Sequence, residues 1–251
     1  MSGGSVPALQ AEVVSKSYSG RTIIQNISLS LEEGVLVCLL GVSGAGKTTL
    51  FNVLSGLERP DTGRVLLKGR DVTGLPGQIS YMLQKDLLLP HKKVADNVAL
   101  PLVIRGKGKR EAREEALSYF NAFGLEGTQD KYPAQLSGGM RQRAALLRTF
   151  LGSQGVALLD EPFSALDALT KREIHRWYMG MMDQLNLTTL FITHDIDEAI
   201  LLSDRVCILS GQPGQITVEL VIRPPRPRDM AFSLSDEFLA YKRQILSLLE
   251  A

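Results

Sequence analysis

Residues 35–48 read VLVCLLGVSGAGKT, in which an apolar run passes directly into a glycine-rich turn. The run Val35–Leu40 is typical of a buried β-strand, and Gly41–Thr48 fits the phosphate-loop pattern G-x4-G-K-S/T. In such a loop, backbone amides close around phosphate oxygens, the Lys47 ammonium reaches the β- and γ-phosphates, and the Thr48 hydroxyl ligates Mg²⁺. The stretch therefore predicts a site for a nucleoside triphosphate with magnesium, rather than a structural turn that fits the pattern by chance.

Further apolar runs follow this one and alternate with helical patterns along the chain. Those with strand character cover Ile79–Leu83, Val156–Leu159, Thr188–Ile192 and Arg205–Leu209. Strands that alternate with helices predict a largely parallel sheet with helices on both faces. The segments Ala11–Ser30 and Gly63–Lys68 instead alternate in the manner of antiparallel strands, so an antiparallel β-layer should flank the parallel core.

These elements predict one α/β domain over residues 1–251, with the parallel-sheet core of a P-loop NTPase flanked by helices. We expect the catalytic core and β-layer at about 1–86 and 156–225, and a C-terminal helical tail over 226–251. The region of about 90–150 changes to charged helical sequence, including Lys107–Phe120, and is interpreted as a helical subdomain. After Arg223–Arg228 only one more helix is expected.

Apolar residues at helical spacing indicate which side chains form the core. One helix face contains Leu50, Val53, Leu54 and Leu57, and another contains Ile174, Trp177, Tyr178, Met181, Met182 and Leu185. Both faces are interpreted as core and not as ligand sites. Cys38 and Cys207 lie inside apolar strand-like runs, so they are interpreted as buried thiols instead of a disulfide or a metal site.

Charge and hydrophobicity argue against several classes of protein. The 28 Lys and Arg residues and 27 Asp and Glu residues give a formal net charge of +1, without a basic block to neutralise nucleic-acid phosphates. The longest apolar run, Val35–Leu40, is far shorter than the ~20 residues that span a bilayer. The segment Met1–Gln10 lacks the features of an export signal, so the chain is expected to remain in the cytosol.

Two adjacent carboxylates, Asp160 and Glu161, end the apolar run that begins at Val156. Parallel sheets place their ligands at the carboxyl ends of strands, so these acids should point toward the phosphates. Asp160 is suited to hold magnesium, and Glu161 to orient and polarise the attacking water. Acids followed by Pro162 also begin helices, and on their own the two interpretations are equal, but the phosphate loop favours catalysis.

Two further polar residues follow predicted strands and should reach the same edge of the sheet. His194 comes after Thr188–Ile192 and is expected close to the γ-phosphate. Gln84 follows Ile79–Leu83, and its amide can bond magnesium-bound or attacking water. Each residue alone would more often be structural, so their functional interpretation depends on the whole set.

The segment Leu136-Ser-Gly-Gly-Met140, which precedes Arg141-Gln-Arg143, adds a motif at the start of a predicted helix. Together with the phosphate loop, the acidic pair, Gln84 and His194, it makes the chain resemble the ABC ATPase family over nearly its whole length. In that family the signature serine and glycines bind the γ-phosphate of an ATP held by the opposite subunit. Met140 replaces the family's commoner glutamine, which should alter contacts without loss of function.

The resemblance also implies the remaining nucleotide contacts. Tyr18 occupies the place of the aromatic residue that stacks on adenine, and Ser164–Asp167 looks like the loop that couples the two composite sites. The expected ATP-binding residues are Tyr18, Gly41, Ser43, Gly44, Ala45, Gly46, Lys47, Thr48, Thr49, Ser137, Gly138, Gly139 and Asp167. The expected catalytic residues are Glu161, His194 and Gln84, and the expected magnesium ligands are Thr48, Gln84 and Asp160.

Membrane partners are implied by the same resemblance. The family works as a homodimer that closes around two ATP molecules, at the cytoplasmic face of the inner membrane, on integral permease subunits. The loop Leu87-Leu-Leu-Pro90 is apolar and is expected to expose three leucines where a coupling helix of the permease docks. A separate extracytoplasmic solute-binding protein is also expected.

Within the family, three segments look most like bacterial importers of the nitrate, sulfonate and taurine group, which also includes thiamine-precursor importers. They are Leu88–Pro90 with Asn97–Pro101, Asp160–Asp167 and Thr193–Glu198. An ATPase subunit does not contact the cargo, so its sequence indicates kinship and not a solute.

Three alternatives share part of the pattern. A soluble ABC ATPase acting on nucleic acid or the ribosome would usually carry coiled-coil insertions or a second cassette, which this sequence lacks. A phosphate-loop kinase would not need Leu136–Met140. An exporter subunit would use the same catalytic residues, so the direction of transport stays open.

Overall fold

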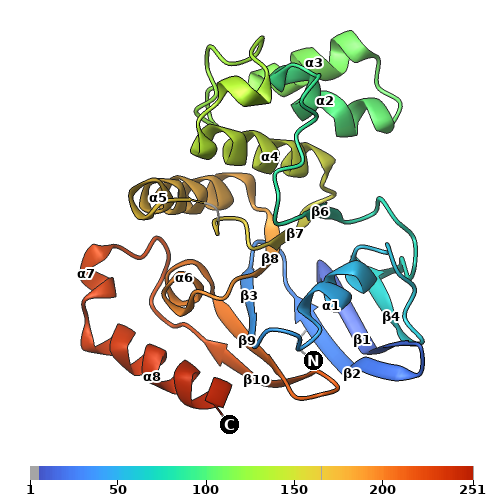
Figure 1. The fold of residues 1–251 in the computed structure, drawn as a ribbon, viewed down its shortest axis with the longest axis vertical. Coiled ribbons are helices and arrows are strands. Elements are labelled where there is room, and N and C mark those ends of the chain that lie inside the picture. The colour runs from blue at the N-terminus through green and yellow to red at the C-terminus, as the bar shows by residue number, and fades with distance from the viewer. Residues whose placement is uncertain (1–5, 165, 251) are drawn as a thin grey trace.

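The structure, a computed structural model, describes residues 6–164 and 166–250 and contains two β-sheets (Figure 1). The larger sheet has the strand order β10-β9-β3-β8-β7-β6, with all neighbours parallel except β10 and β9. Its strands are β3 (Leu36–Gly41), β6 (Ser80–Met82), β7 (Val156–Asp160), β8 (Thr188–Ile192), β9 (Arg205–Ser210) and β10 (Gln215–Val221). The smaller sheet is antiparallel, in the order β2-β1-β4-β5, and comprises β1 (Leu9–Tyr18), β2 (Arg21–Leu31), β4 (Thr62–Leu67) and β5 (Arg70–Asp71).

Side-chain alternation along β3 shows why this strand is apolar throughout. Leu36, Cys38 and Leu40 belong to one core cluster, and Val37 and Leu39 belong to the other. Successive side chains of a strand point to opposite faces, so a central strand that is covered on both sides needs an uninterrupted apolar run. The face of Val37 and Leu39 shares its core with the antiparallel sheet and helix α1 (Lys47–Leu54).

The opposite face of the large sheet is covered by helices. They include α4 (Gly138–Gly152), α5 (Ala168–Leu185), α6 (Ile196–Leu202) and α8 (Asp236–Glu250), which share one core cluster. The helices α2 (Val94–Ile104) and α3 (Lys109–Ser118) stand at one end of the molecule beyond α4, with the 3₁₀ turn Pro133–Gln135 leading into α4 (Figure 1). The short helix α7 (Met230–Ser233) precedes α8. None of the helices among the described residues is long and apolar enough to span a bilayer.

The predicted fold class is confirmed, with five parallel-sheet strands found within about one or two residues of their expected bounds. Strand β10 was missed because its residues alternate between exposed and half-buried at the sheet edge and form no apolar run. The single expected C-terminal helix is in fact two, α7 and α8. Cys38 and Cys207 are buried free thiols, as expected.

Three leucines were placed wrongly. Leu57 lies beyond the end of α1 and is 60% exposed, so it does not continue the core face of that helix. Leu88 is only 7% exposed because it packs with the helical core cluster, and Leu89 is half-buried. Of the three leucines expected on the surface of the loop before Pro90, only Leu87 is largely exposed, at 50%.

Asn97, on the buried side of α2, holds the loop that leads into this helix. Its side-chain oxygen accepts from the Leu89 N–H at 2.6 Å, and its Nδ2 atom lies 3.1–3.2 Å from the carbonyl oxygens of Leu89, Lys92 and Lys93. The residue is fully buried. A buried amide that satisfies several backbone groups fixes the loop against the helix more firmly than apolar contact would.

We predict that Asn97→Ala lowers the free energy of unfolding by about 2–4 kcal/mol, because it strands a buried N–H and buried carbonyls. Urea unfolding followed by circular dichroism measures the change. Asn121→Ala is the matched control, since Asn121 is exposed and should change stability by about 0.5 kcal/mol or less. Equal losses for the two variants would contradict this account of Asn97.

Candidate functional site

Parallel pairing brings four strand ends to one edge of the large sheet. Leu39 of β3 pairs with Ile192 of β8, Ile192 pairs with Asp160 of β7, and Leu159 pairs with Met82 of β6. The residues that follow these strands therefore emerge side by side. They are the glycine-rich loop after β3, Glu161 after β7, His194 after β8 and Gln84 after β6.

The glycine-rich loop closes tightly onto the start of α1. Gly44 and Gly46 have φ angles of 82° and 96°, a left-handed conformation that other residues adopt at a cost. A Cβ atom on Gly46 would lie 2.6 Å from Cγ2 of Ile24, so the site also lacks space for a side chain. Ser43, Gly44 and Thr48 are exposed, and Ala45 is buried. The first amides of α1 have no side-chain cap and are oriented to bind an anion.

Lys47 lies across the mouth of this loop. Its Nζ atom donates to the carbonyl oxygens of Gly41 at 2.7 Å and Val42 at 3.0 Å. Burial lowers the pKa of Lys47, and the nearby charges of Glu161 and Asp160 partly oppose that shift. The ammonium is therefore partly withdrawn from water, which strengthens its attraction for a phosphate.

Asp160 is partly buried at the end of β7. Burial raises the pKa of Asp160, the charge of Glu161 adds to the rise, and the Tyr81 hydroxyl and Lys47 oppose it. The Tyr81 hydroxyl donates to Oδ2 of Asp160 at 3.3 Å. Burial and the charge of Glu161 make the ionised form of Asp160 less stable, and a cation beside the carboxylate would stabilise that form. The surroundings of Asp160 therefore favour binding of a positive ion.

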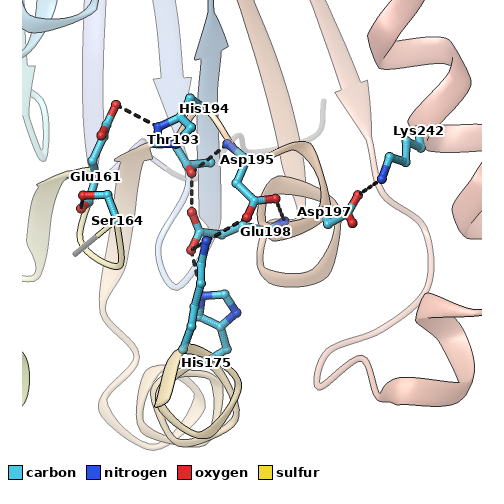
Figure 2. A network of polar contacts seen from close by, with 10 residues as sticks. Glu161, Ser164, His175, Thr193, His194, Asp195, Asp197, Glu198 and Lys242 are labelled. Atoms are coloured by element: carbon cyan, nitrogen blue, oxygen red, sulfur yellow. Dashed lines mark hydrogen bonds and ion pairs between the residues drawn. The ribbon is translucent and has the colours of Figure 1, made fainter. Parts of the chain in front are cut away.

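Glu161 is held between two of the other predicted residues. Nε2 of Gln84 donates to Oε2 of Glu161 at 2.9 Å. Nδ1 of His194 lies 3.1 Å from Oε1, a contact shown in Figure 2. The backbone of Glu161 has a φ of 46°, a strained value that is fixed by its N–H bond to Ile192 and by Ser164, which donates to its carbonyl. Strained non-glycine residues gather at functional sites, where their surroundings hold a side chain in a required direction.

Tyr18 ends β1 and is 40% exposed, so part of its side chain is accessible. Its hydroxyl donates to Glu58, and the Lys16 ammonium lies 5.4 Å from the ring centroid. Burial raises the pKa of Tyr18 to about 12, and the hydrogen bond and charge of Glu58 contribute to the shift, which Thr49 partly opposes. The ring is thus a fixed, uncharged surface near the side of α1.

The signature residues begin α4. Ser137 is the N-cap, and its hydroxyl accepts from the Met140 N–H at 3.2 Å. Gly138 is exposed, whereas Gly139 is buried against α5, where an added Cβ would lie 3.0 Å from Cγ2 of Thr170. The structure does not bring this helix start to the phosphate loop of the same chain, because α4 and α1 lie at different levels of the molecule (Figure 1). The signature residues are therefore separate from the phosphate loop of their own chain.

Asp167 is the N-cap of α5, and its carboxylate accepts from the N–H groups of Leu169 and Thr170, both at 3.1 Å. The hydrogen bonds from Thr170 keep the pKa of Asp167 below its usual range. In the predicted coupling loop Ser164–Asp167, Ala165 lies outside the described residues. Of that loop, the structure thus establishes the helix-capping contact of Asp167.

Arg148, near the end of α4, forms hydrogen bonds to the loop that follows Gln84. Its guanidinium donates to the carbonyl oxygens of Asp86 and Leu87, the second at 2.8 Å, and Leu87 has a φ of 45°. Burial lowers the pKa of Arg148, and Asp86 partly opposes the shift. One helix thus carries Ser137 at its start and holds the loop of Gln84 near its end.

The profile of the family described as ABC transporter matches residues 24–164, more than half of the chain. This chain belongs to the ABC transporter family. It is the ATP-binding subunit of an ABC transporter, and it is an ATPase.

Individual relatives agree with the family assignment. A formylaminopyrimidine import ATP-binding protein of Halalkalibacterium halodurans, ThiZ, is 44% identical over 244 residues, or 96% of this chain and 96% of the relative. The sulfate/thiosulfate import ATP-binding protein CysA of Vibrio vulnificus is 41% identical over 228 residues, 87% of this chain and 66% of its own length. The dimeric post-hydrolysis structure of the ATP-binding cassette MJ0796, bound to ADP and Pi, is 28% identical with a TM-score of 0.73 and covers 86% of this chain and 100% of its own.

Sequence reasoning missed several residues that support the ABC site. Tyr81 and Arg148 are examples, and nothing in their spacing marks them as partners of Asp160 or of the loop after Gln84. Lys171 forms an ion pair with the buried Glu198 near the turn that carries His194. The spacing of Lys171 and His175, four residues apart on α5, was an available signal, because such residues share one helix face.

We predict that Gly46→Ala destabilises the ABC cassette and weakens nucleotide binding. Gly20→Ala is the matched control, since Gly20 has a φ of 80° but no atom within 4 Å of an added Cβ. The control should cost about 1 kcal/mol from backbone strain alone. Gly46→Ala should cost more, because the new methyl group displaces the loop from Ile24. Urea unfolding and titration with a fluorescent ATP analogue measure both effects, and equal behaviour of the two variants would contradict the prediction.

Proposed function

We propose that this chain is the energy-coupling ATPase of a bacterial importer, which hydrolyses ATP as a homodimer on permease subunits. The observation that carries the proposal is the Glu161 carboxylate, bonded to Gln84 and placed 3.1 Å from His194 at the edge where the phosphate loop opens. A carboxylate fixed on both oxygens beside a phosphate-binding loop is suited to orient a water molecule for attack on a γ-phosphate.

The nucleotide contacts within one chain follow from the same edge. The amides of Gly41–Thr48 and the start of α1 surround the phosphates, and Lys47 exchanges its carbonyl partners for phosphate oxygens. Thr49 lies beside Tyr18, whose partly exposed ring stacks on the adenine base. These roles account for Ser43, Gly44, Ala45 and Gly46 as parts of one backbone cradle.

Magnesium fits the oxygen donors that the sequence predicts at this edge of the sheet. Thr48, Asp160 and Gln84 would hold it, and hydroxyl, carboxylate and amide oxygens are the ligands that this hard cation prefers. Among the described residues no three His, Cys, Asp or Glu side chains form a metal-holding group. Phosphate oxygens and waters would complete the coordination of the ion. The ion would neutralise charge on the phosphates.

The protein groups supply the rest of the chemistry. Glu161 accepts a hydrogen bond from the attacking water and polarises it, while Gln84 and His194 fix the direction of the carboxylate. The water oxygen forms a bond to the γ-phosphorus, the bond to the β-γ bridging oxygen breaks, and ADP and phosphate leave. Lys47 stabilises the charge that develops on the departing oxygens.

A second copy supplies the missing half of the site. Ser137, Gly138 and Gly139 lie away from the phosphate loop of their own chain, and their free helix amides would bind the γ-phosphate of the partner's ATP. Asp167, in the loop before α5, would lie between the two sites. The dimeric state of the MJ0796 cassette supports this arrangement.

Membrane docking is proposed for the region around the loop after Gln84. Leu83 and Leu87 are 40% and 50% exposed, and Ile104 at the end of α2 is 76% exposed. Arg148 ties this loop to α4, so a coupling helix that rests on it would sense the position of the nucleotide-binding edge. The proposed location is therefore the cytoplasmic face of the inner membrane, with the residues of about 90–150 acting as a helical subdomain.

The direction and cargo rest on kinship. The relatives described above are named as import ATP-binding proteins for formylaminopyrimidine and for sulfate or thiosulfate. We therefore propose import, with a separate extracytoplasmic solute-binding protein. The nitrate, sulfonate and taurine group remains our proposal for the type of importer, and the formylaminopyrimidine relative makes its thiamine-precursor branch the first cargo class to test.

We predict that Glu161→Gln lowers ATP turnover about a hundredfold or more while ATP binding persists. The amide keeps the size of the side chain but polarises water poorly, so ATP should hold two copies together. Turnover by phosphate release and mass by light scattering, with and without ATP and magnesium, measure the two effects. Glu173→Gln, an exposed change on α5, is the control and should leave both unchanged. Normal turnover in Glu161→Gln would refute the role of Glu161.

We predict that Tyr18→Ala weakens ATP binding about tenfold, because a base-aromatic stack contributes on the order of 1–3 kcal/mol. Tyr18→Phe keeps the ring and loses only the hydrogen bond to Glu58, so its affinity should stay within about twofold of the original. Titration calorimetry with ATP measures both. If the two variants lose affinity equally, the hydroxyl group and not stacking is the basis of the contact.

A further inference from the structure

A cluster of charged side chains around the buried Glu198 lies below His194 in Figure 2, between α5 and the start of α6. Its centre is Glu198, which is only 3% exposed. Nε2 of His175 lies 2.7 Å from Oε1 of Glu198, Nζ of Lys171 lies 3.6 Å from the same oxygen, and the Thr193 hydroxyl donates to Oε2. Because each oxygen of this buried carboxylate has a partner, the cluster defines one arrangement of α5 relative to the turn before α6.

The cluster fixes the backbone on both sides of His194. Thr193 is buried, and its hydroxyl also accepts from the Asp195 N–H at 3.1 Å. Asp195 caps α6 by accepting from the Glu198 N–H at 3.1 Å. The side chain of His194 itself is 68% exposed. The direction of His194 toward Glu161 is therefore determined mainly by the contacts of Thr193 and Asp195, its neighbours in the chain, and not by packing around its ring.

Lys171 connects this turn to α5. Its Nζ atom lies 2.7 Å from Oδ2 of Asp195, which makes it the shared cation of Asp195 and Glu198. Burial alone would lower the pKa of Lys171, but the bond to Asp195 and the charge of Glu198 raise it above its usual value. Burial alone would raise the pKa of Asp195, and the bond from Lys171 brings it below its usual range. Each partner thus keeps the other charged.

The position of Lys171 along α5 relates this contact to the other predicted site residues. Its N–H bonds the carbonyl oxygen of Asp167 at 2.8 Å, so it belongs to the first turn of the helix that Asp167 caps. One turn later, His175 contacts both Glu198 and the ring of Phe163, 4.8 Å between centroids, two residues after Glu161. The same helix face therefore touches the segments that carry Glu161, His194 and Asp167.

We propose that Lys171 is a positioning residue for His194, and that its ion pairs with Asp195 and Glu198 keep the imidazole at the Glu161 carboxylate. This inference rests on the proposed function, in which His194 supports hydrolysis. Lys171 touches neither ATP nor the attacking water. It acts through the turn Thr193–Asp195, so its loss slows the chemical step while the phosphate loop and Tyr18 still bind ATP.

A double-mutant cycle on the full-length chain tests the inference. Lys171→Met, His194→Ala and the double variant are compared by kcat, KM for ATP and melting temperature. Misplacing a catalytic group should slow turnover about tenfold in Lys171→Met, with KM unchanged, and Lys171→Arg should recover most of kcat. In the His194→Ala background, Lys171→Met should have no further effect, because it acts only through that side chain.

Two additional variants separate positioning from simple stability. Asp195→Asn removes the ion pair between Lys171 and Asp195 but leaves Lys171 paired with Glu198. Asparagine remains a good N-cap, so this variant serves if Lys171→Met does not fold. Lys242→Met is the matched control, since Lys242 also pairs with α6, at 2.6 Å from Asp197, but from the side of α8. Asp195→Asn should reproduce the fall in kcat, and Lys242→Met should leave kcat unchanged.

The outcomes distinguish this inference from the proposed function. If His194→Ala is slow and Lys171→Met slows turnover by the same factor in that background, the inference is wrong and the proposed function stands. An unchanged kcat in Lys171→Met has the same meaning. If His194→Ala itself retains full turnover, the role of His194 in the proposed function fails, and with it the role of Lys171.

Discussion

The site of this protein depends on the parallel register of β6, β7, β8 and β3. Pairing of Met82 with Leu159, of Asp160 with Ile192 and of Ile192 with Leu39 makes the four strands end together. A slip of one residue in any of these pairs would turn a strand over and move its terminal polar group away from the phosphate loop. The register is in turn maintained by apolar side chains on both faces of the sheet, because a slip of one residue would move the side chains of that strand from one core cluster to the other. The chemistry at the edge is thus fixed by packing several residues away from it.

Charged groups at this edge are arranged in two layers with different tasks. The outer layer holds Lys47, Asp160 and Glu161, whose burial or mutual charges leave them ready for a phosphate and a cation. The inner layer holds Lys171, Asp195 and Glu198, which satisfy one another and contact no expected ligand. Ionic contacts inside a protein contribute little net stability when their desolvation is counted, but they define one geometry well. An inner layer of this kind can hold the exposed imidazole of His194 in place.

Much of the fold, and the meeting of Gln84, Glu161 and His194 at one edge of the sheet, could be predicted from the sequence because both depend on local patterns. Five apolar runs indicated the parallel strands, and glycine spacing indicated the loop that joins β3 to α1. The errors arose where tertiary contacts decide. Leu88 was expected on the surface of an apolar docking loop but packs into the helical core, and β10 has no apolar run because one of its faces is exposed. The partners of the site residues, Tyr81, Arg148 and Lys171, are distant in sequence from the groups they hold, and single-sequence patterns contain no information about such pairs.

The geometry of helix α4 limits which substitutions, insertions and deletions this chain can tolerate. Ser137 caps its start and Arg148 holds the loop after Gln84 near its end, eleven residues later, which is about three full turns. The two groups therefore project from the same side of a stiff rod, and their separation is fixed at about 16 Å by the helical rise. Substitutions on the other sides of this rod leave that geometry intact. Inserting or deleting one residue between them would rotate one group by about 100° relative to the other, so this segment should vary in composition among functional chains but not in length.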